Sequence, residues 1–167
     1  MSPLATSRRG SRILMFCFTA GLVVLLDQAT KAAVRHLFPN LGYMATLIPG
    51  VIDLVHVENT GAAFSIGEGA GPLFAVLAVV VAFVGFIFVS SNDLPLSLTL
   101  SIASVVGGGL GNMVDRLMSG SVTDFIATTF IDFPVFNVAD IAVTCGIVVS
   151  VVGYLLWEQS LTLDVRG

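Results

Sequence analysis

The stretch PLFAVLAVVVAFVGFIFV at residues 72–89 contains no charged residue. It is long enough to cross the hydrocarbon of a bilayer, which takes about 20 apolar residues. Three further segments have a similar length and apolar content, and they lie at residues 13–34, 94–118 and 138–157. All four runs are continuous rather than alternating, which is not the pattern of membrane β-strands. The sequence therefore predicts four transmembrane helices.

The composition of the chain agrees with a membrane protein. Of its 167 residues, 56% are hydrophobic and 11% are charged, whereas soluble domains have about 25% charged residues. The mean hydropathy of +0.98 is too high for a soluble domain of this size to bury its apolar surface. The net charge of -4 comes with no basic patch in the sequence, so nucleic-acid binding is not expected. We expect a single membrane-embedded domain over residues 1–167, with loose tails at 1–11 and 161–167.

Positive charges predict the orientation of the chain. Arg8, Arg9 and Arg12 precede the first span, and such residues favour the cytoplasmic side of a membrane. An even number of spans would return the C-terminus to that side as well. The longer connections, residues 35–71 and 119–137, would then lie on the outer side. The first of them is rich in Val, Ile, Gly and Pro, which favours short strands at the membrane surface.

The first span also has the layout of a secretory signal peptide, with arginines ahead of an apolar stretch. However, the polar residues 27–31 follow the stretch where a small-residue cleavage site would stand. The sequence therefore favours an uncleaved first helix.

The cysteines and histidines do not suggest a reactive or metal-binding centre. Cys17 and Cys145 lie in apolar runs far apart in the sequence, so we expect two buried free thiols. His36 and His56 both fall in the first long connection and are expected at the surface. The sequence has no HExxH motif, Cys/His cluster or Walker-type glycine loop, so neither a zinc protease nor a phosphate-binding loop is predicted.

Polar residues from separate spans are expected to share one layer near the outer ends of the helices. At 1.5 Å per residue, Asp27 lies about 21 Å into the first span and Asn112 about 27 Å into the third. Asp140 falls in the first turn of the fourth span, and Asp124 lies just beyond the third. Ionisable residues at membrane depth are costly and usually mark a functional site. This convergence is the strongest physical signal in the sequence.

Two alternatives exist for the polar pair in the first span. Asp27 and Lys31 are four residues apart and share a helix face, with the acid on the favourable N-terminal side. They form either a structural ion pair or part of a site, and these roles are compatible. Lys31 could instead extend to the outer headgroups.

A second polar face is expected on the third span. Asn112, Asp115 and Arg116 share one side of the helix. The glycines within residues 107–111 precede them and predict close packing against a neighbouring helix. The alternative is that Asp115 and Arg116 anchor the helix at the membrane interface.

Asp124 and Asp140 are candidates for paired acid and base catalysis. When two carboxylates share a water in a low dielectric, their pKa values are pushed apart. One then takes a proton from water while the other donates to the leaving group. The structural alternative is that Asn137 caps the fourth helix and Asp140 interacts with the helix dipole. Asp132, next to Phe133 and Pro134, is expected to be solvated.

These motifs resemble the lipoprotein signal peptidases, the type II signal peptidases of bacteria. Each block of the resemblance is weak alone, but the ordered set within a four-span chain is specific. The blocks are DQATK at 27–31, NTGAAFS at 59–65, GNMVDR at 111–116, VTDF at 122–125 and FNVAD at 136–140.

The resemblance implies an all-α membrane protein with four transmembrane helices and a small β-rich cradle in the first extracytoplasmic loop. It implies an aspartyl endopeptidase that cuts diacylglyceryl-modified prolipoproteins just before the lipid-modified cysteine, with Asp124 and Asp140 as the catalytic dyad. Residues that would support the site or bind substrate are Asp27, Lys31, Asn59, Gly61, Asn112, Asp115, Arg116 and Asn137.

The resemblance also implies no cofactor or metal, inhibition by globomycin, and an active site toward the outer face of the bacterial cytoplasmic (inner) membrane. Membrane lipid and prolipoproteins are the expected partners, and a monomer is the simplest assembly. The loop at 127–135 departs from the usual pattern because it contains no Trp.

Two other classes of protein remain open. A proton- or ion-coupled transporter also uses intramembrane Asp and Lys, but its polar groups should lie near the midplane, often between repeats. A structural membrane subunit uses polar groups to join helices, but it does not need two further carboxylates beside the third and fourth spans.

Overall fold

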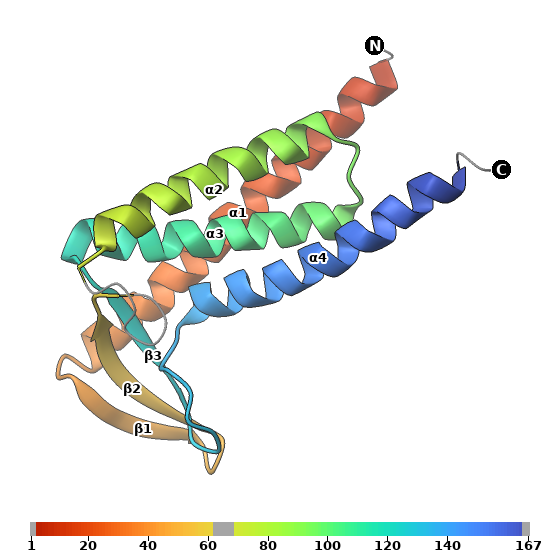
Figure 1. The fold of residues 1–167 in the computed structure, drawn as a ribbon. Helices are drawn as coiled ribbons and strands as arrows, with labels where there is room; N and C mark the ends of the chain where they lie inside the picture. Colours follow the sequence, from red (N-terminus) through yellow and green to blue (C-terminus); the bar gives the residue numbers. More distant parts are fainter. Residues whose placement is uncertain (1–2, 62–68, 165–167) are drawn as a thin grey trace.

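The computed structural model describes residues 3–61 and 69–164. Helices and a small sheet alternate along the chain (Figure 1), and the strands come from the two long connections. The elements are α1 (Pro3–Leu37), β1 (Gly42–Ile48), β2 (Ile52–Asn59), α2 (Gly71–Ser91), α3 (Leu96–Ser119), β3 (Val122–Thr128) and α4 (Val138–Asp164). The predicted all-α membrane fold with a small sheet is confirmed.

All four helices are long and apolar enough to cross a membrane. The spanning segments are Arg9–Leu37, Gly71–Ser91, Leu96–Ser119 and Val138–Gln159. The helices continue beyond them, since α1 begins at Pro3 and α4 ends at Asp164. Residues 3–11 and 161–164 are therefore helical, and the expectation that they are loose tails stays a prediction. Extending an existing helix is easier than starting one. Residues 1–2 and 165–167 lie outside the described part.

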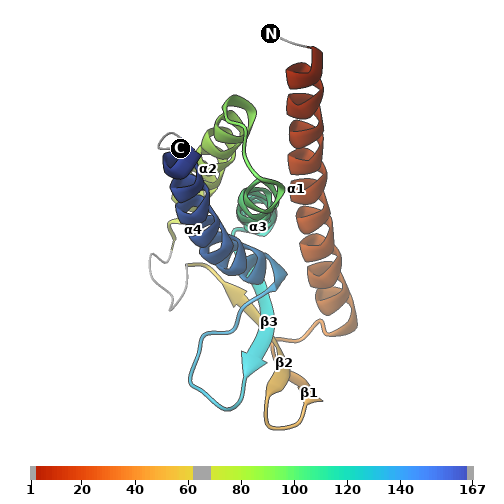
Figure 2. The ribbon, with the colours of Figure 1, turned by 90° about the vertical axis from the view of Figure 1, so that its right-hand side faces the viewer.

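Helix α3 is central in the bundle and packs against the other three helices, as Figure 2 shows nearly along its axis. The glycines of α3 make this possible. A Cβ atom added at Gly107 would lie 2.7 Å from the carbonyl oxygen of Ala20 on α1. One added at Gly108 would lie 2.5 Å from the carbonyl oxygen of Ala139 on α4. The predicted close helix packing at these glycines is confirmed.

Gly108→Ala is expected to destabilise the bundle because its methyl group would meet the backbone of α4. Overpacking of this kind costs about 1–3 kcal/mol, which should lower the melting temperature by several degrees. Gly109→Ala is the matched control, since its Cβ would make an ordinary 3.8 Å contact with Ala78. Equal melting temperatures for the two variants in detergent would contradict this account of the packing.

The sheet lies at one end of the bundle, and both chain termini lie at the other (Figure 1). Its strands are antiparallel in the order β1-β2-β3, so β2 is central. The predicted strands in the first connection are confirmed, whereas β3 was not anticipated. At the end of α3, Gly120 adopts φ 79° and its N–H bonds the Arg116 carbonyl oxygen. This left-handed cap turns the chain so that β3 can begin at Val122.

The two cysteines are free, as expected, but they are not buried. Cys17 on α1 and Cys145 on α4 are both exposed at the helix surfaces. The expectation of burial was wrong because an apolar side chain on a membrane helix can face lipid instead of protein. Large apolar side chains such as Leu14, Phe18 and Phe83 are exposed on the helices in the same way.

Candidate active site

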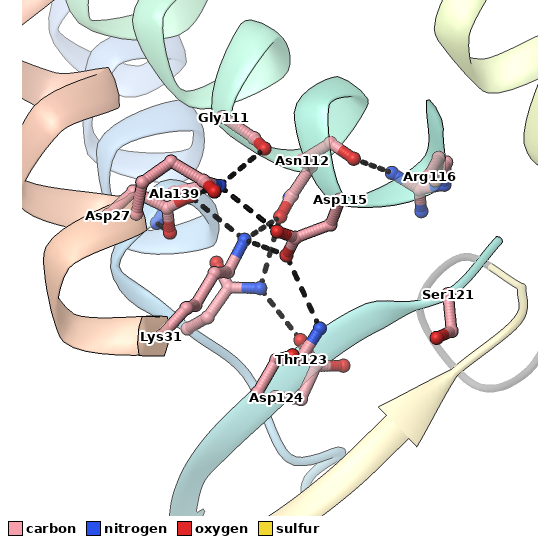
Figure 3. Close-up of polar contacts among 12 residues, drawn as sticks. Asp27, Lys31, Gly111, Asn112, Asp115, Arg116, Ser121, Thr123, Asp124 and Ala139 are labelled. Atoms are coloured by element: carbon pink, nitrogen blue, oxygen red, sulfur yellow. Dashed lines mark hydrogen bonds and ion pairs between the residues drawn. The ribbon is translucent and has the colours of Figure 1, made fainter. Parts of the chain in front are cut away.

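At the sheet end of the bundle, polar side chains from α1, α3 and β3 lie close together (Figure 3). The expected convergence of separate spans is therefore present. All the residues named from the sequence as site candidates enter one connected set of contacts. They are Asp27, Lys31, Asn59, Gly61, Asn112, Asp115, Arg116, Asp124, Asn137 and Asp140.

Lys31 occupies the centre of this set and is fully buried. Its Nζ lies 2.9 Å from Asp27 Oδ2 and 2.9 Å from Asp115 Oδ2, and it donates to Asn112 Oδ1 at 2.7 Å. Two carboxylates and an amide thus compensate the cost of burying the ammonium group. The structural ion pair is confirmed. The alternative that Lys31 reaches the headgroups is wrong, because its side chain has no exposed surface.

Asp27 joins three helices through its carboxylate. Its Oδ1 accepts a 3.0 Å hydrogen bond from the backbone N–H of Ala139, near the start of α4. A Cβ atom at Gly111 of α3 would lie 2.6 Å from Asp27 Oδ2, so glycine provides the space for this carboxylate. The fully buried Asp27 therefore fixes α1 against both α3 and α4.

Gln28 belongs to the same network, although it was not among the predicted site residues. Its Nε2 donates to the carbonyl oxygen of Gly111 at 3.0 Å, to Asp115 Oδ1 at 3.1 Å and to Asp27 Oδ2 at 3.2 Å. Its position between Asp27 and Lys31, both predicted site residues, was the one feature of the sequence that indicated this role.

Asp124 is held on β3 by two asparagine side chains. Asn59 Nδ2 donates to its Oδ2 at 2.9 Å, and Asn137 Nδ2 donates to its Oδ1 at 2.7 Å. Only 3% of Asp124 is exposed. Burial raises the pKa of Asp124 to about 6, with a further upward contribution from the charge of Asp140, while the asparagine hydrogen bonds lower it. A carboxyl group with such a pKa can hold or release a proton near neutral pH.

Asp140 and Asn137 cap the start of α4 reciprocally. The Asp140 N–H donates to Asn137 Oδ1 at 3.0 Å, and the Asn137 N–H donates to Asp140 Oδ2 at 3.1 Å. The capping alternative for Asn137 is thus correct. It does not remove these residues from the site, because Asn137 also bonds Asp124 and Asn112 Nδ2 donates to Asp140 Oδ1 at 2.8 Å. Asn137 therefore connects the two carboxyl groups.

Arg116 connects α3 to the segment after β2. Its Nη2 donates to the carbonyl oxygen of Gly61 at 2.8 Å, and its guanidinium lies 5.0 Å from the centroid of the Phe74 ring. Asp115 is 3% exposed and pairs with Lys31. An interfacial Asp115–Arg116 anchor is therefore wrong, since Asp115 faces the protein interior. Residues 62–65 of the NTGAAFS block lie outside the described part.

A cavity of about 440 Å³ opens onto both carboxyl groups. Its polar lining comes from Asn59, Asn112, Arg116, Asp124 and Asp140. Its apolar lining comes from residues 133–136 and from Ile141, Val143 and Cys145. A mostly apolar pocket with a few convergent polar groups is typical of ligand sites. Asp132, in the loop beside this cavity, is exposed as predicted.

The two histidines differ in their surroundings. His36 is exposed, as expected. His56 is 5% exposed, so its predicted surface position was wrong. Its Nδ1 lies 2.7 Å from the carbonyl oxygen of Phe38, and its Nε2 lies 3.2 Å from Glu58 Oε1. Across residues 3–61 and 69–164, no group of three or more His, Cys, Asp or Glu side chains is arranged to hold a metal ion.

Four spanning helices around a buried polar site define an integral membrane protein with a site at one end of its bundle. Residues 19–156 match the family model described as signal peptidase (SPase) II. The chain belongs to this family, the lipoprotein signal peptidases, which are membrane proteases of bacteria.

Individual relatives agree with the family match. The chain is 35% identical over 147 residues to a lipoprotein signal peptidase of Streptococcus pyogenes serotype M5 (strain Manfredo), covering 87% of this chain and 94% of that one. It is 33% identical over 150 residues to a lipoprotein signal peptidase of Latilactobacillus sakei subsp. sakei (strain 23K), covering 88% and 97%. A bacterial membrane enzyme determined by the in meso method at 2.3 Å resolution superposes with a TM-score of 0.78 at 30% identity, covering 90% of each chain.

Proposed function

We propose that this chain is an aspartyl endopeptidase that removes the signal peptide from diacylglyceryl-modified prolipoproteins, cutting just before the lipid-modified cysteine. The observation that carries the proposal is the pair Asp124 and Asp140, which line one cavity and are connected through Asn137. Paired carboxyl groups on a shared cavity can activate a water molecule. Membership of a protease family supports the same reaction.

The two carboxyl groups divide the proton transfers in this proposal. Asp140, which is less buried than Asp124 and lines the same cavity, takes a proton from water. The water oxygen then forms a bond to the scissile carbonyl carbon. Asp124, whose pKa is raised to about 6 by burial, gives its proton to the leaving nitrogen as the C–N bond breaks. The products are a signal peptide with a new carboxyl group and a lipoprotein with a free cysteine amine.

The surroundings of the dyad suit a lipidated substrate. One wall of the cavity is apolar, with Phe133, Phe136 and Ile141 among its residues, and acyl chains need such a surface. Arg116, Asn59 and Asn112 face the same cavity. We assign them to holding the peptide or the carboxyl groups. Gly61 contributes through its carbonyl oxygen, which orients Arg116.

We also propose the orientation of the chain in the bacterial cytoplasmic (inner) membrane. Both termini lie at one end of the bundle and the sheet at the other (Figure 1). The arginines before the first span favour the cytoplasm for the end with the termini. The polar site would then open near the outer face, where the end of a signal peptide emerges from the bilayer. A monomer in contact with lipid is the proposed assembly.

The test of this function is cleavage of a diacylglyceryl-modified prolipoprotein by the purified chain in detergent. The matched control is the same precursor without the lipid. We expect cleavage of the lipidated precursor only, and inhibition by globomycin. Cleavage of both precursors would contradict the proposed specificity, and cleavage of neither would contradict the function.

The pH dependence of kcat/KM reports the pKa of Asp124 in the free enzyme. We expect kcat/KM to fall as the pH rises through about 6, because Asp124 then loses the proton that the reaction needs. Asn59→Ala removes a hydrogen bond that lowers this pKa. The pH at which kcat/KM declines should therefore be higher in this variant, by about one unit.

Asn92→Ala is the control for this pH profile. Asn92 follows α2 and donates to the Phe88 carbonyl oxygen, away from the carboxyl pair. Its substitution should leave the pH profile in place. A decline that stays in place or moves to lower pH in Asn59→Ala would contradict the assigned role of Asp124.

A further inference from the structure

A second polar cluster lies between β2 and β3, beside Asp124. Glu58 stands opposite Thr123 in the strand register. Its Oε1 accepts a 2.9 Å hydrogen bond from Thr123 Oγ1, and its Oε2 accepts a 2.6 Å hydrogen bond from Ser121 Oγ. Thr123 directly precedes Asp124 on β3, and Ser121 lies at the entry to that strand (Figure 3). A single carboxylate thus holds the start of the strand that carries Asp124.

The hydrogen bonds of this cluster show which atoms of Glu58 and His56 face donors and which face acceptors. Arg35 Nη1 donates to Thr123 Oγ1 at 2.9 Å, which leaves the hydroxyl proton of Thr123 for Glu58. Both Glu58 oxygens are therefore acceptors, as in a carboxylate. His56 Nε2 faces Glu58 Oε1, and His56 Nδ1 faces the carbonyl oxygen of Phe38. Both partners of the ring are acceptors, so a ring that bonds both of them has to donate from both nitrogens.

The other charged groups around His56 are few among the described residues. Glu58 lies on the same strand, and Arg35 of α1 is connected through Thr123. Arg35 also lies 3.5 Å from Asp115 of α3. Strand β1, which pairs with β2, contains no charged residue. The ring of His56 is almost entirely buried, and its Nε2 lies 3.2 Å from Glu58 Oε1.

We propose that Glu58 is a positioning residue for Asp124, and that the charged ring of His56 holds Glu58 in place. The inference rests on the function proposed above. Glu58 fixes the chain on the N-terminal side of Asp124, while the adjacent Asn59 donates to the Asp124 carboxyl group. Glu58 and Asn59, neighbours on β2, thus fix the position of the backbone before Asp124 and the position of its carboxyl group. The contacts of His56 at Phe38 tie this arrangement to the end of α1.

The kinetic test compares Thr123→Val with Thr123→Ser on the lipidated precursor. Valine keeps the shape but removes the hydroxyl group, so we expect kcat to fall by about ten- to a hundredfold with little change in KM, as for a slightly misplaced catalytic group. Serine keeps the hydroxyl group and should keep most of kcat. Glu58→Ala should behave as Thr123→Val does. The inference is overturned if valine and serine are equally active, or if both lose kcat equally.

A structural role alone gives a different result. It would lower the melting temperature of Thr123→Val while kcat per folded molecule stays at the wild-type value, and this would also overturn the inference. Melting temperatures and the fraction of folded protein are therefore measured for each variant beside kcat and KM.

The second test is nitrogen-15 NMR of protein labelled at histidine, which gives two ring systems because the chain has 2 His. The exposed His36 ring is the internal reference. At neutral pH we expect both nitrogens of His56 to be protonated, and this signature to disappear in Glu58→Ala. A singly protonated His56 ring in the wild type would overturn the inference. If the wild type does not cut the lipidated precursor, the proposed function fails, and the ring signal still decides whether the charged pair exists.

Discussion

Asp124→Asn and Asp140→Asn are each expected to abolish cleavage of the lipidated precursor while the chain stays folded. Asparagine keeps the size of the side chain and one acceptor oxygen, so one of the two hydrogen bonds that each carboxyl group accepts can be retained. It can neither take a proton from water nor deliver one to the leaving nitrogen. Loss of acid or base catalysis should lower kcat by about a thousandfold or more.

Asp132→Asn is the matched control for these two variants. Asp132 is an exposed acid in the loop between β3 and α4, so its substitution should leave kcat at the wild-type value. Folding can be checked at Lys31, the only lysine in the chain, which is fully buried. An amine-reactive label should reach it only in unfolded protein, and peptide mass spectrometry separates this from labelling of the N-terminus. Normal cleavage by either asparagine variant would contradict the dyad.

Lys31→Met is expected to have the largest effect on stability. Methionine fills a similar volume but leaves the buried Asp27 without a cation and leaves Asp115 with only Arg35, at 3.5 Å. Removing one partner of a buried ion pair costs about 3–5 kcal/mol. The melting temperature in detergent should therefore fall sharply, or the protein should fail to accumulate.

The double variant Lys31→Met/Asp115→Asn tests the cause of that loss. It replaces one of the two carboxylates that lose Lys31 by a neutral group, so it should recover part of the melting temperature. If Lys31→Met alone has the melting temperature of the wild type, this would contradict the view that the Lys31 cation holds α1 against α3. No recovery in the double variant would show that the loss arises from packing rather than from charge.

Much of the fold could be predicted because membrane crossing imposes simple length and composition rules. The spans end within a few residues of their expected positions, and the glycines at 107 and 108 were correctly interpreted as helix contacts. The polar layer was predictable for the same reason, since Asp27, Asn112 and Asp140 are costly to place in lipid. Position along a helix was enough to bring these residues to one end.

The remainder depended on contacts between segments distant in the sequence. Strand β3 is a short segment of mixed polarity that pairs with β2, and nothing local in Val122–Thr128 specifies that partner. His56 is buried because of Phe38 and Glu58, which no periodic pattern reveals. Gln28 acts through three partners from two helices. The exposed Cys17 on α1 and the cavity-lining Cys145 on α4 have surroundings that their apolar sequence neighbours do not specify.

The most direct test of the account is mass analysis of the products formed by the purified chain from the lipidated precursor in oxygen-18 water. The account predicts two products, separated just before the lipid-modified cysteine. The signal peptide should carry one oxygen-18 atom in its new carboxyl group, and the lipoprotein should carry none. Asp124→Asn and Asp140→Asn should yield neither product. Cleavage at another bond, unlabelled products, or as much product from either variant as from the wild type would contradict hydrolysis by this aspartate pair.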